Sequence, residues 1–397
     1  MISKIMKKDQ VIDFVYSNLD FFNDKNFISC EEIGDGNINY VFRLKEGEKS
    51  LIVKQADVLL RSSARPLDIN RSAIEAKALS LEYKLSSGCV PKVYLYDKEK
   101  SLIVMEDIGE YKNLRKELLE DRFYSNLAEN LSDFISKTLI PTTDLVIDRK
   151  VKKEKVREFI NPDLCDISED LVFTEPYYDY KGRNLISEGL LAFVEKNLYN
   201  NKKLHTEVLK LKDKFQTKAQ ALLHGDLHLG SIFVNEKGIK VIDPEFAFYG
   251  PIGYDIGNIW GNLFFPLTNA IIREKYKKII EELTKIIIET INLTNKKLSR
   301  IYDDTVTNKF YKNDAYKSFY INEIIADSYG YAGTEIIRRT VGDSKVIEIT
   351  SISEIDKRKK LDKILIDFGI YLIKNRANIN KTSLLMEKYK DSVKKYL

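Results

Sequence analysis

Two short acidic motifs lie close together past the middle of this 397-residue chain. The first, with the sequence HGD, ends on Asp226, and the second, with the sequence DPE, carries Asp243 and Glu245. Transfer of a phosphoryl group needs one carboxylate that orients the attacking hydroxyl and others that hold the Mg²⁺ bridging the nucleotide phosphates. The residue types and their spacing therefore suit a phosphoryl-transfer site.

The segment between the motifs has the pattern of a hairpin. Two β-prone runs flank a Lys-Gly turn at 237–238, so the motifs stand at the two ends of one strand–loop–strand unit. Alone, the HGD motif would also suit an ordinary polar turn, and the DPE motif a helix start. The chain contains only three histidines, however, and two of them, His224 and His228, lie in the first loop. This concentration favours a functional site.

Together, the motifs resemble the catalytic loop and the metal-binding segment of the protein-kinase-like phosphotransferases. In related small-molecule kinases the loop usually ends in Gly-Asn and the metal segment reads Asp-x-Asp. Here the loop ends in Gly230-Ser231, and DPE is followed by FAFYGPIGYDIGN. This combination resembles the methylthioribose kinase family of the aminoglycoside phosphotransferase superfamily.

The resemblance implies an ATP-dependent kinase that phosphorylates the 1-hydroxyl of S-methyl-5-thioribose to give the 1-phosphate used in methionine salvage. It implies ATP and Mg²⁺ as cofactors, with Asp243 and Glu245 as metal ligands. Asp226 is the implied catalytic residue, which accepts a hydrogen bond from the attacking hydroxyl and positions it. Ser231 stands where relatives have an asparagine ligand, and we expect little metal coordination from it.

The nucleotide is expected to bind to the N-terminal part of the chain. Two β-prone runs joined by a turn predict a hairpin over 40–54 that ends on Lys54. In a kinase-like lobe such a lysine contacts the nucleotide phosphates, and a helix glutamate holds the lysine in place. The candidate is Glu75, in a helix-forming run at 71–85, and Glu82 on the same helix is its competitor.

A turn before this hairpin and a second hairpin after it complete the expected nucleotide site. The turn could be a flap whose backbone N–H groups approach the phosphates, or a plain structural turn; its candidate residues are Gly34, Gly36, Asn37 and Asn39. The second hairpin spans 92–105 and runs into a polar segment. Backbone groups there suit a hinge that hydrogen-bonds adenine, although an ordinary strand end has the same pattern; the residues are Glu106, Asp107 and Ile108.

Beyond residue 112 the pattern becomes helical, apart from the central hairpin unit. The clearest helix is predicted over 270–292, where Ile272, Tyr276 and later isoleucines form one apolar stripe. A small β-rich part followed by a large helical part predicts an α+β, bilobal, protein-kinase-like fold with an antiparallel sheet in its small lobe. We expect a nucleotide-binding lobe over 1–108 and a catalytic and substrate-binding lobe over 109–397.

Two adjacent arginines, Arg338 and Arg339, lie in the segment GTEIIRRTVG, which resembles the family segment that grips the sugar. Adjacent residues of a helix point about 100° apart, so both could reach one pocket only at a helix end or at a break. An exposed arginine pair is the alternative. We expect the pair to bind the substrate together with Asp226.

Three further residues lie near the catalytic loop. Asp255 is expected at a helix start, where it could cap the helix or, as the resemblance implies, brace the loop. His224 is expected to buttress the loop, and the pattern assigns no role to His228.

Two segments depart from the family pattern. The family usually carries Trp-Pro-Leu before the helix glutamate, whereas this chain has RPL at 65–67 and lacks that aromatic contact with the sugar. After the arginine pair the family continues Gly-Leu-Ala-His, whereas this chain has GDSK at 342–345. Both differences concern recognition of the sugar, and neither touches the phosphoryl-transfer residues.

Composition argues against several other classes of protein. The net charge of +4 is small and the charges are interspersed, so no nucleic-acid or membrane-surface partner is expected. Three separated cysteines without a CxxC motif predict neither disulfides nor a zinc site. No apolar run is long enough to span a membrane, and no signal-peptide pattern is present. We expect a cytoplasmic enzyme with a small-molecule sugar substrate, and the resemblance implies a homodimer.

Two other functions stay open. A kinase of another small hydroxyl substrate, such as an aminoglycoside, choline or a different pentose, would carry the same motifs, although the arginine pair argues against a cationic substrate. A non-catalytic pseudokinase would bind nucleotide as an interaction module. Loss of Asp226, Lys54 or Asp243 would indicate it, and all three are present.

Overall fold

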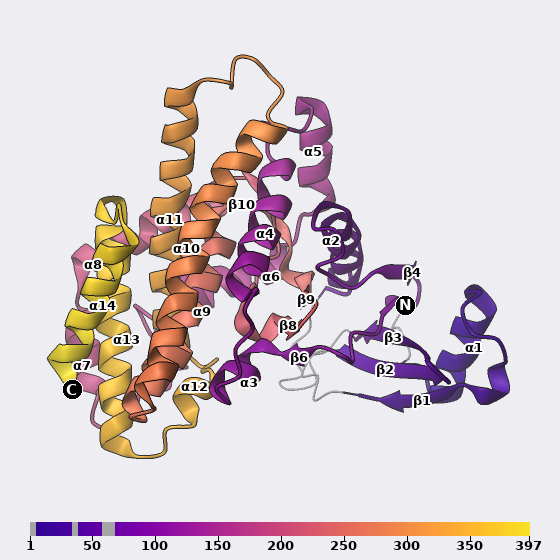
Figure 1. The fold of residues 1–397 in the computed structure, drawn as a ribbon, viewed down its shortest axis with the longest axis horizontal. Helices are drawn as coiled ribbons and strands as arrows, with labels where there is room; N and C mark the ends of the chain where they lie inside the picture. The colour runs from indigo at the N-terminus through magenta and orange to yellow at the C-terminus, as the bar shows by residue number, and fades with distance from the viewer. Residues whose placement is uncertain (1–4, 34–38, 58–67) are drawn as a thin grey trace.

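A computed structural model describes residues 5–33, 39–57 and 68–397 (Figure 1). The predicted flap residues Gly34, Gly36 and Asn37 and the departing segment 65–67 lie outside the described residues. In Figure 1 a β-sheet and α1 lie at the right, and long helices fill the left. The predicted α+β class, with a β-rich part and a larger helical part, is confirmed.

The β-rich part is an antiparallel sheet of five strands in the order β1-β2-β3-β5-β4. Both predicted hairpins are confirmed, since β2 pairs with β3 and β4 pairs with β5. The helices α1 and α2 belong to this part of the chain. The elements are α1 (Lys8–Asn18), β1 (Ser29–Glu32), β2 (Asn39–Glu46), β3 (Lys49–Ala56), α2 (Arg71–Leu85), β4 (Val93–Asp97) and β5 (Leu102–Glu106). The division after residue 108 stays a prediction.

Alternation along β3 decides where Lys54 points. Val53 packs in an apolar cluster with residues of α1, whereas Ile52 packs in the main core with residues of α2. Successive side chains of a strand point to opposite faces of the sheet, so Lys54 shares the face of Ile52. The strand therefore directs Lys54 toward the helix that carries Glu75.

Two small sheets frame the acidic motifs. β7 (Ala221–Leu223) pairs with β10 (Phe248–Gly250), and β8 (Ile232–Asn235) pairs with both β6 (Lys112–Asn113) and β9 (Gly238–Val241). The predicted hairpin over 232–242 is therefore confirmed. Each acidic motif follows the end of a strand: the first comes after β7 and the second after β9.

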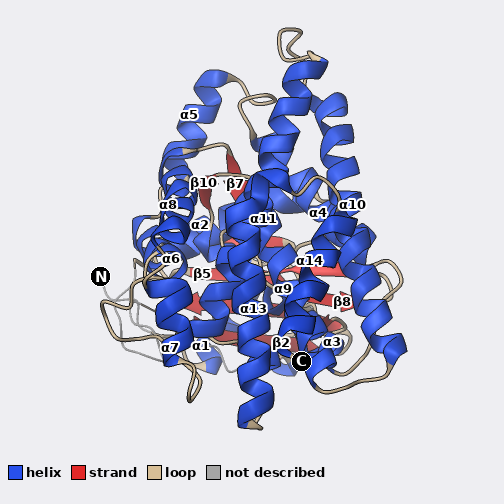
Figure 2. Cartoon of the chain, turned by 90° about the vertical axis from the view of Figure 1, so that its left-hand side faces the viewer, coloured by secondary structure: helices blue, strands red, loops and turns tan. Residues whose placement is uncertain are grey.

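The remaining elements are mainly helices, which cover the strands in Figure 2. None of the described helices is both long and apolar enough to cross a bilayer. The helices are α3 (Leu114–Leu119), α4 (Leu127–Leu139), α5 (Arg149–Glu158), α6 (Pro162–Phe173), α7 (Leu191–Val194), α8 (Lys202–Thr217), α9 (Gly253–Ile272), α10 (Lys277–Thr305), α11 (Asp314–Val341), α12 (Ile347–Thr350), α13 (Ile355–Asn375) and α14 (Thr382–Tyr396).

The single helix predicted over 270–292 is wrong, because α9 ends and α10 begins within it. Glu274 takes the left-handed conformation with φ of 55°. The N–H of Lys275 then donates to the carbonyl of Ala270, and the N–H of Glu274 donates to that of Ile271, both at 3.0 Å. This is a Schellman ending, which usually uses glycine, so the residue types gave no sign of it. Tyr276, predicted in the apolar stripe, is 85% exposed.

Two glycines let α9 and α11 approach closely. A Cβ atom at Gly257 would lie 2.6 Å from the carbonyl oxygen of Ser328, and one at Gly261 would lie 2.8 Å from that of Ala332. A larger residue at either position would force the helices apart. This contact fixes the start of α9, which carries Asp255, relative to α11, which carries the arginine pair.

Candidate active site

Asp255 braces the catalytic loop. Its buried carboxylate accepts hydrogen bonds from the backbone N–H groups of His224 at 2.6 Å and Gly225 at 3.1 Å. Gly225 has φ of 86°, and a Cβ atom there would lie only 2.2 Å from the carbonyl oxygen of Phe246. Only glycine suits that position. Of the two roles considered for Asp255, the geometry supports bracing, because both bonds go to the loop.

His224 joins the two acidic motifs. Its Nε2–H donates to the carbonyl oxygen of Ile242 at 2.9 Å, and its Nδ1 accepts from the backbone N–H of Asp226 at 3.4 Å. Burial lowers the pKa of His224 to about 4, so the ring is neutral near pH 7. A neutral ring that bonds both motifs supports the expected buttressing role.

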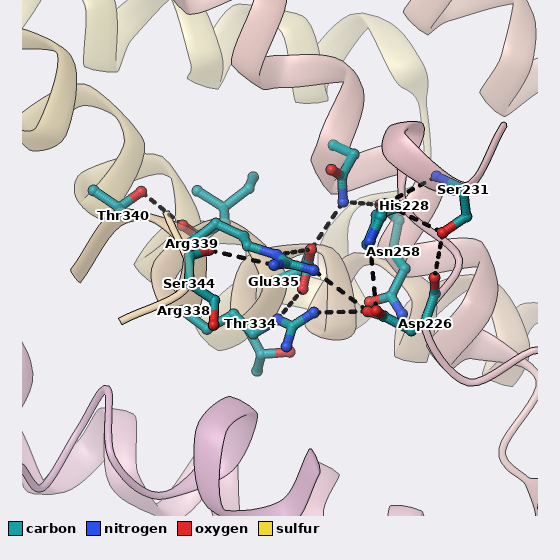
Figure 3. Close-up of polar contacts among 12 residues, drawn as sticks. Asp226, His228, Ser231, Asn258, Thr334, Glu335, Arg338, Arg339, Thr340 and Ser344 are labelled. Atoms are coloured by element: carbon teal, nitrogen blue, oxygen red, sulfur yellow. Dashed lines mark hydrogen bonds and ion pairs between the residues drawn. The ribbon is translucent and has the colours of Figure 1, made fainter. Parts of the chain in front are cut away.

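Asp226 lies among three cationic or proton-donating side chains (Figure 3). Its Oδ1 accepts from Nη2 of Arg338 at 3.0 Å and from Nη2 of Arg339 at 3.3 Å. Its Oδ2 lies 3.4 Å from Nε2 of His228. Burial alone would raise the pKa of Asp226, but His228 and the two arginines outweigh it and hold that pKa well below its usual range. Asp226 is thus a carboxylate that accepts hydrogen bonds and holds protons weakly.

The contacts of His228 determine which of its nitrogens carries the proton. Nδ1 accepts from the backbone N–H of Ser231 at 3.1 Å, so in the neutral ring the proton is on Nε2, the atom that faces Asp226. The hydroxyl of Ser231 donates to the carbonyl oxygen of Asp226 at 3.2 Å. The structure thus places His228, to which the sequence assigned no role, directly at the carboxylate.

The arginine pair reaches Asp226 from the last turn of α11. The helix is unbroken up to Val341, so the pair lies at a helix end, one of the two arrangements that the sequence required. The carbonyl oxygen of Ser344, in the segment that departs from the family pattern, accepts from Nη1 of Arg339 at 3.3 Å. Neither arginine is an exposed surface residue, since their side chains are 10% and 12% exposed.

Lys54 is surrounded by carboxylates. Its Nζ lies 2.7 Å from Oε1 of Glu75 and 2.6 Å from Oδ1 of Asp243. Burial would lower the pKa of Lys54, but Asp243 and Glu75 outweigh it and raise that pKa. Burial would likewise raise the pKa of Asp243, and Lys54 lowers it. Glu82, the competitor of Glu75, is also buried, but it is Glu75 that pairs with the Lys54 ammonium from α2.

Glu245 is buried among polar side chains, two residues after Asp243. Its Oε2 lies 3.4 Å from Nε of Arg71 and 3.5 Å from Nδ2 of Asn39, the one flap residue that the structure describes. The described residues hold no group of three or more His, Cys, Asp or Glu side chains arranged for a metal. Two carboxylates nevertheless suit Mg²⁺, which keeps waters and binds nucleotide phosphates beside one or two protein carboxylates.

A cavity of about 290 Å³ lies between the five-stranded sheet and the small sheet of β6, β8 and β9. Lys54, Glu75 and Asp243 lie at its polar side, and Ile52, Met105 and Phe233 contribute apolar walls. The predicted hinge residues Glu106, Asp107 and Ile108 also line it. The hinge carboxylates are already paired, Glu106 with Lys240 at 2.7 Å and Asp107 with Arg43 at 2.8 Å. Apolar walls with Lys54 at the polar side suit a nucleotide. The flat base would contact the walls, and the phosphates would contact the lysine.

Comparison with known proteins identifies the family. Residues 29–278 match the model of the phosphotransferase enzyme family. A methylthioribose kinase of Bacillus velezensis is 38% identical over 390 residues, which cover 95% of this chain and 94% of the relative. A methylthioribose kinase of Exiguobacterium sibiricum is 40% identical over 353 residues, which cover 88% and 89%. The chain belongs to the methylthioribose kinases, within the phosphotransferase enzyme family.

The two kinds of match cover different parts of the site. The phosphotransferase model ends at residue 278 and so includes Lys54, Asp226 and Asp243. It leaves out Arg338 and Arg339, which lie within the match to the methylthioribose kinase of Bacillus velezensis. The residues predicted for phosphoryl transfer therefore lie in the part of the chain that matches the broad family, and the arginine pair lies in the part beyond it that methylthioribose kinases share.

Several site residues were not predicted from the sequence. Arg71 is 1% exposed and pairs with Glu245, although it opens a helix where a solvated arginine is usual. Glu335 is fully buried and contacts both arginines of the pair. A signal for Glu335 does exist: it stands three and four residues before the arginines, on the same face of the helix.

Proposed function

We propose that this protein transfers the γ-phosphoryl group of ATP to the 1-hydroxyl of S-methyl-5-thioribose. The product would be the 1-phosphate used in methionine salvage. The kinase class follows from the family, and the sugar is proposed from the names of its relatives. The observation that carries the proposal is the meeting of Arg338 and Arg339 at Asp226. Two guanidinium groups beside the positioning carboxylate suit a neutral acceptor rich in hydroxyls.

Asp226 would accept a hydrogen bond from the 1-hydroxyl and aim its oxygen at the γ-phosphorus. The new bond joins that oxygen to phosphorus as the bond between the γ-phosphorus and the bridging oxygen breaks, and ADP leaves. The hydroxyl proton passes to Asp226. Because the pKa of Asp226 is low, the carboxylate mainly orients the hydroxyl, and proton transfer would follow the loss of negative charge from the oxygen.

Lys54 would bind the nucleotide phosphates, with Glu75 holding the lysine and the segment up to Asn39 covering them. We propose Asp243 and Glu245 as the ligands of Mg²⁺, whose charge offsets that of the phosphates when it is bound. The base would occupy the cavity beside Glu106, Asp107 and Ile108.

A kinase of an aminoglycoside or of choline is the alternative. A cationic acceptor would have to approach Asp226 past two guanidinium groups, so the electrostatics of the described site oppose it. The homodimer and the cytoplasmic location implied by the family resemblance stay predictions. Sedimentation equilibrium would test the first, and cell fractionation the second.

An acceptor panel tests the proposal. ADP release is measured with S-methyl-5-thioribose, ribose, choline and an aminoglycoside at saturating ATP and Mg²⁺. We expect the highest kcat/KM with methylthioribose, and a ³¹P spectrum of the product that shows a phosphate on C1. If choline or the aminoglycoside is the better acceptor, the sugar assignment is wrong and only the kinase class remains.

A further inference from the structure

Glu335 contacts both arginines of the pair. It is fully buried on α11, about one turn before them. Its Oε2 accepts a short hydrogen bond from Nε of Arg338, and its Oε1 accepts from Nε of Arg339 at 3.0 Å (Figure 3). One carboxylate therefore engages the same edge of two guanidinium groups.

These bonds explain how adjacent helical residues meet at one oxygen. The two side chains leave the helix about 100° apart, yet each is drawn back toward the position three or four residues earlier. With Nε held by Glu335, the Nη2 atoms of Arg338 and Arg339 are left to face Asp226, at 3.0 and 3.3 Å. Glu335 thus decides which edge of each guanidinium is free.

The charges of Glu335, Asp226 and the two arginines also support a positioning role for Glu335. Arg338 and Arg339 outweigh burial and lower the pKa of Glu335 to about 2, so this group is a carboxylate at any working pH. Two positive groups then face two negative ones. Without the charge of Glu335, Asp226 would be the only negative partner that the described part of the chain offers to both arginines. They would then compete with the acceptor hydroxyl for the oxygens of Asp226.

Glu335 is itself held from behind. Nδ2 of Asn262, on α9, donates to Oε1 of Glu335 at 2.9 Å. Oδ1 of Asn262 accepts from Nη2 of Arg115 at 2.6 Å, and Nη1 of Arg115 pairs with Glu348 at 2.6 Å. Asn262, Glu335 and Glu348 are all fully buried. This network joins α3, α9, α11 and α12, and through Asn262 it holds the orientation of the Glu335 carboxylate.

We propose that Glu335 is a positioning residue for the acceptor: it turns Arg338 and Arg339 so that their outer N–H groups meet acceptor hydroxyls beside Asp226. The inference rests on the proposed function in one respect only, that the pair binds the acceptor. It does not depend on which sugar the acceptor is.

The test compares Glu335→Gln with Asp327→Asn. Asp327 is a buried carboxylate two turns earlier on α11, paired with the partly exposed Lys214 at 2.8 Å, and serves as a control for the loss of a buried, ion-paired carboxylate on this helix. In Glu335→Gln we expect the KM of the acceptor to rise about tenfold or more, as for a lost charge-assisted bond, with the Kd of ATP unchanged. In Asp327→Asn, acceptor KM should change less than twofold. Glu335→Asp should lie between wild type and Glu335→Gln.

A mutant cycle separates positioning from a general structural effect. If Glu335 acts through the pair, Glu335→Gln should cause no further loss of kcat/KM in an Arg338→Ala/Arg339→Ala background. An additive loss there, or an equal KM rise in Asp327→Asn, would overturn the proposal.

Should Glu335→Gln fail to bind ATP, Asn262→Ala replaces it and should raise acceptor KM by a smaller factor. An unchanged KM in Asn262→Ala would also overturn the proposal. All assays use the best acceptor of the panel, so a wrong sugar assignment shows in the wild type and leaves this test intact.

Discussion

The Nζ of Lys54 lies 2.6 Å from Oδ1 of Asp243, on a segment 189 residues further along the chain. This ion pair joins the five-stranded sheet to the segment just after β9, at the polar side of the proposed nucleotide cavity. Asp243 is also the expected first metal ligand. We therefore expect Asp243 to exchange Lys54 for Mg²⁺ when the nucleotide binds, while Lys54 moves to the phosphates and keeps Glu75.

Removal of either proposed metal ligand should weaken the response to Mg²⁺. Asp243→Ala and Glu245→Ala each delete a hard oxygen ligand of the proposed metal site. Loss of a residue that only supports a metal ligand weakens metal binding by roughly tenfold or more, so the Mg²⁺ concentration for half-maximal rate should rise by at least that factor here. The measurement is initial rate against Mg²⁺ at saturating ATP. Ser231→Ala is the control, because its hydroxyl bonds the loop backbone. If Ser231→Ala has the largest effect, the metal site is misassigned.

Asp226→Asn should abolish turnover and spare nucleotide binding. Asparagine keeps the shape, but it loses the charge that pairs with the arginines, and an amide NH2 donor replaces one of the two acceptor oxygens. We expect kcat to fall by about 10²- to 10⁴-fold, as for other positioned acid–base groups. Calorimetry with ATP should give a nearly unchanged Kd. A variant that keeps more than about a third of wild-type kcat would remove Asp226 from this role.

Arg338→Ala and Arg339→Ala should each weaken use of the sugar without weakening ATP binding. Loss of charge-assisted hydrogen bonds costs about 1.5–3 kcal/mol, or about 10- to 100-fold in kcat/KM. The Kd of ATP should not change, because neither arginine lines the cavity proposed for the nucleotide. Steady-state kinetics with methylthioribose and ribose give the result. If neither variant affects the sugar, the pair does not bind it.

Arg65→Trp tests the departure of segment 65–67 from the family pattern. Restoring the aromatic residue should lower the KM of methylthioribose, because the family resemblance implies that an aromatic side chain at this position contacts the sugar. Ribose, which lacks the methylthio group, is the control acceptor and should gain less. An unchanged KM for methylthioribose would show that this chain closes its pocket without the aromatic contact.

His224 should make stability depend on pH. Its pKa falls from 6.5 to about 4 on folding, so the unfolded chain takes up the proton first. The free energy of unfolding should therefore lose up to about 3 kcal/mol as pH falls from 6.5 through 4, and keep it fully above 6.5. His224→Gln retains a donor for Ile242 without the titration. Denaturation series at several pH values should show the wild-type advantage shrinking toward pH 4. Parallel curves would contradict the assignment.

The features that the sequence predicted well are local. The hairpins, the 71–85 helix and the acidic motifs each depend on alternation, turn residues or spacing within a few positions. The Lys54–Glu75 contact followed because a known lobe pattern specifies it. The end of α9 was missed because Glu274 adopts a conformation for which glycine is the usual signal. Arg71 was missed because long-range packing buries a residue type that is usually solvated. Glu335 was missed because a charged helix residue is usually exposed, although its spacing from the arginines was a local signal.

The contact of α9 with α11 has a consequence for how acceptor preference changes over evolution. Asp255 on α9 holds the loop of Asp226, and α11 holds the arginines, so their separation depends on Gly257 and Gly261. A substitution at either glycine would move the arginines relative to the carboxylate without touching any ligand. Variants selected for a new sugar should therefore include changes at this helix seam, well behind the pocket wall.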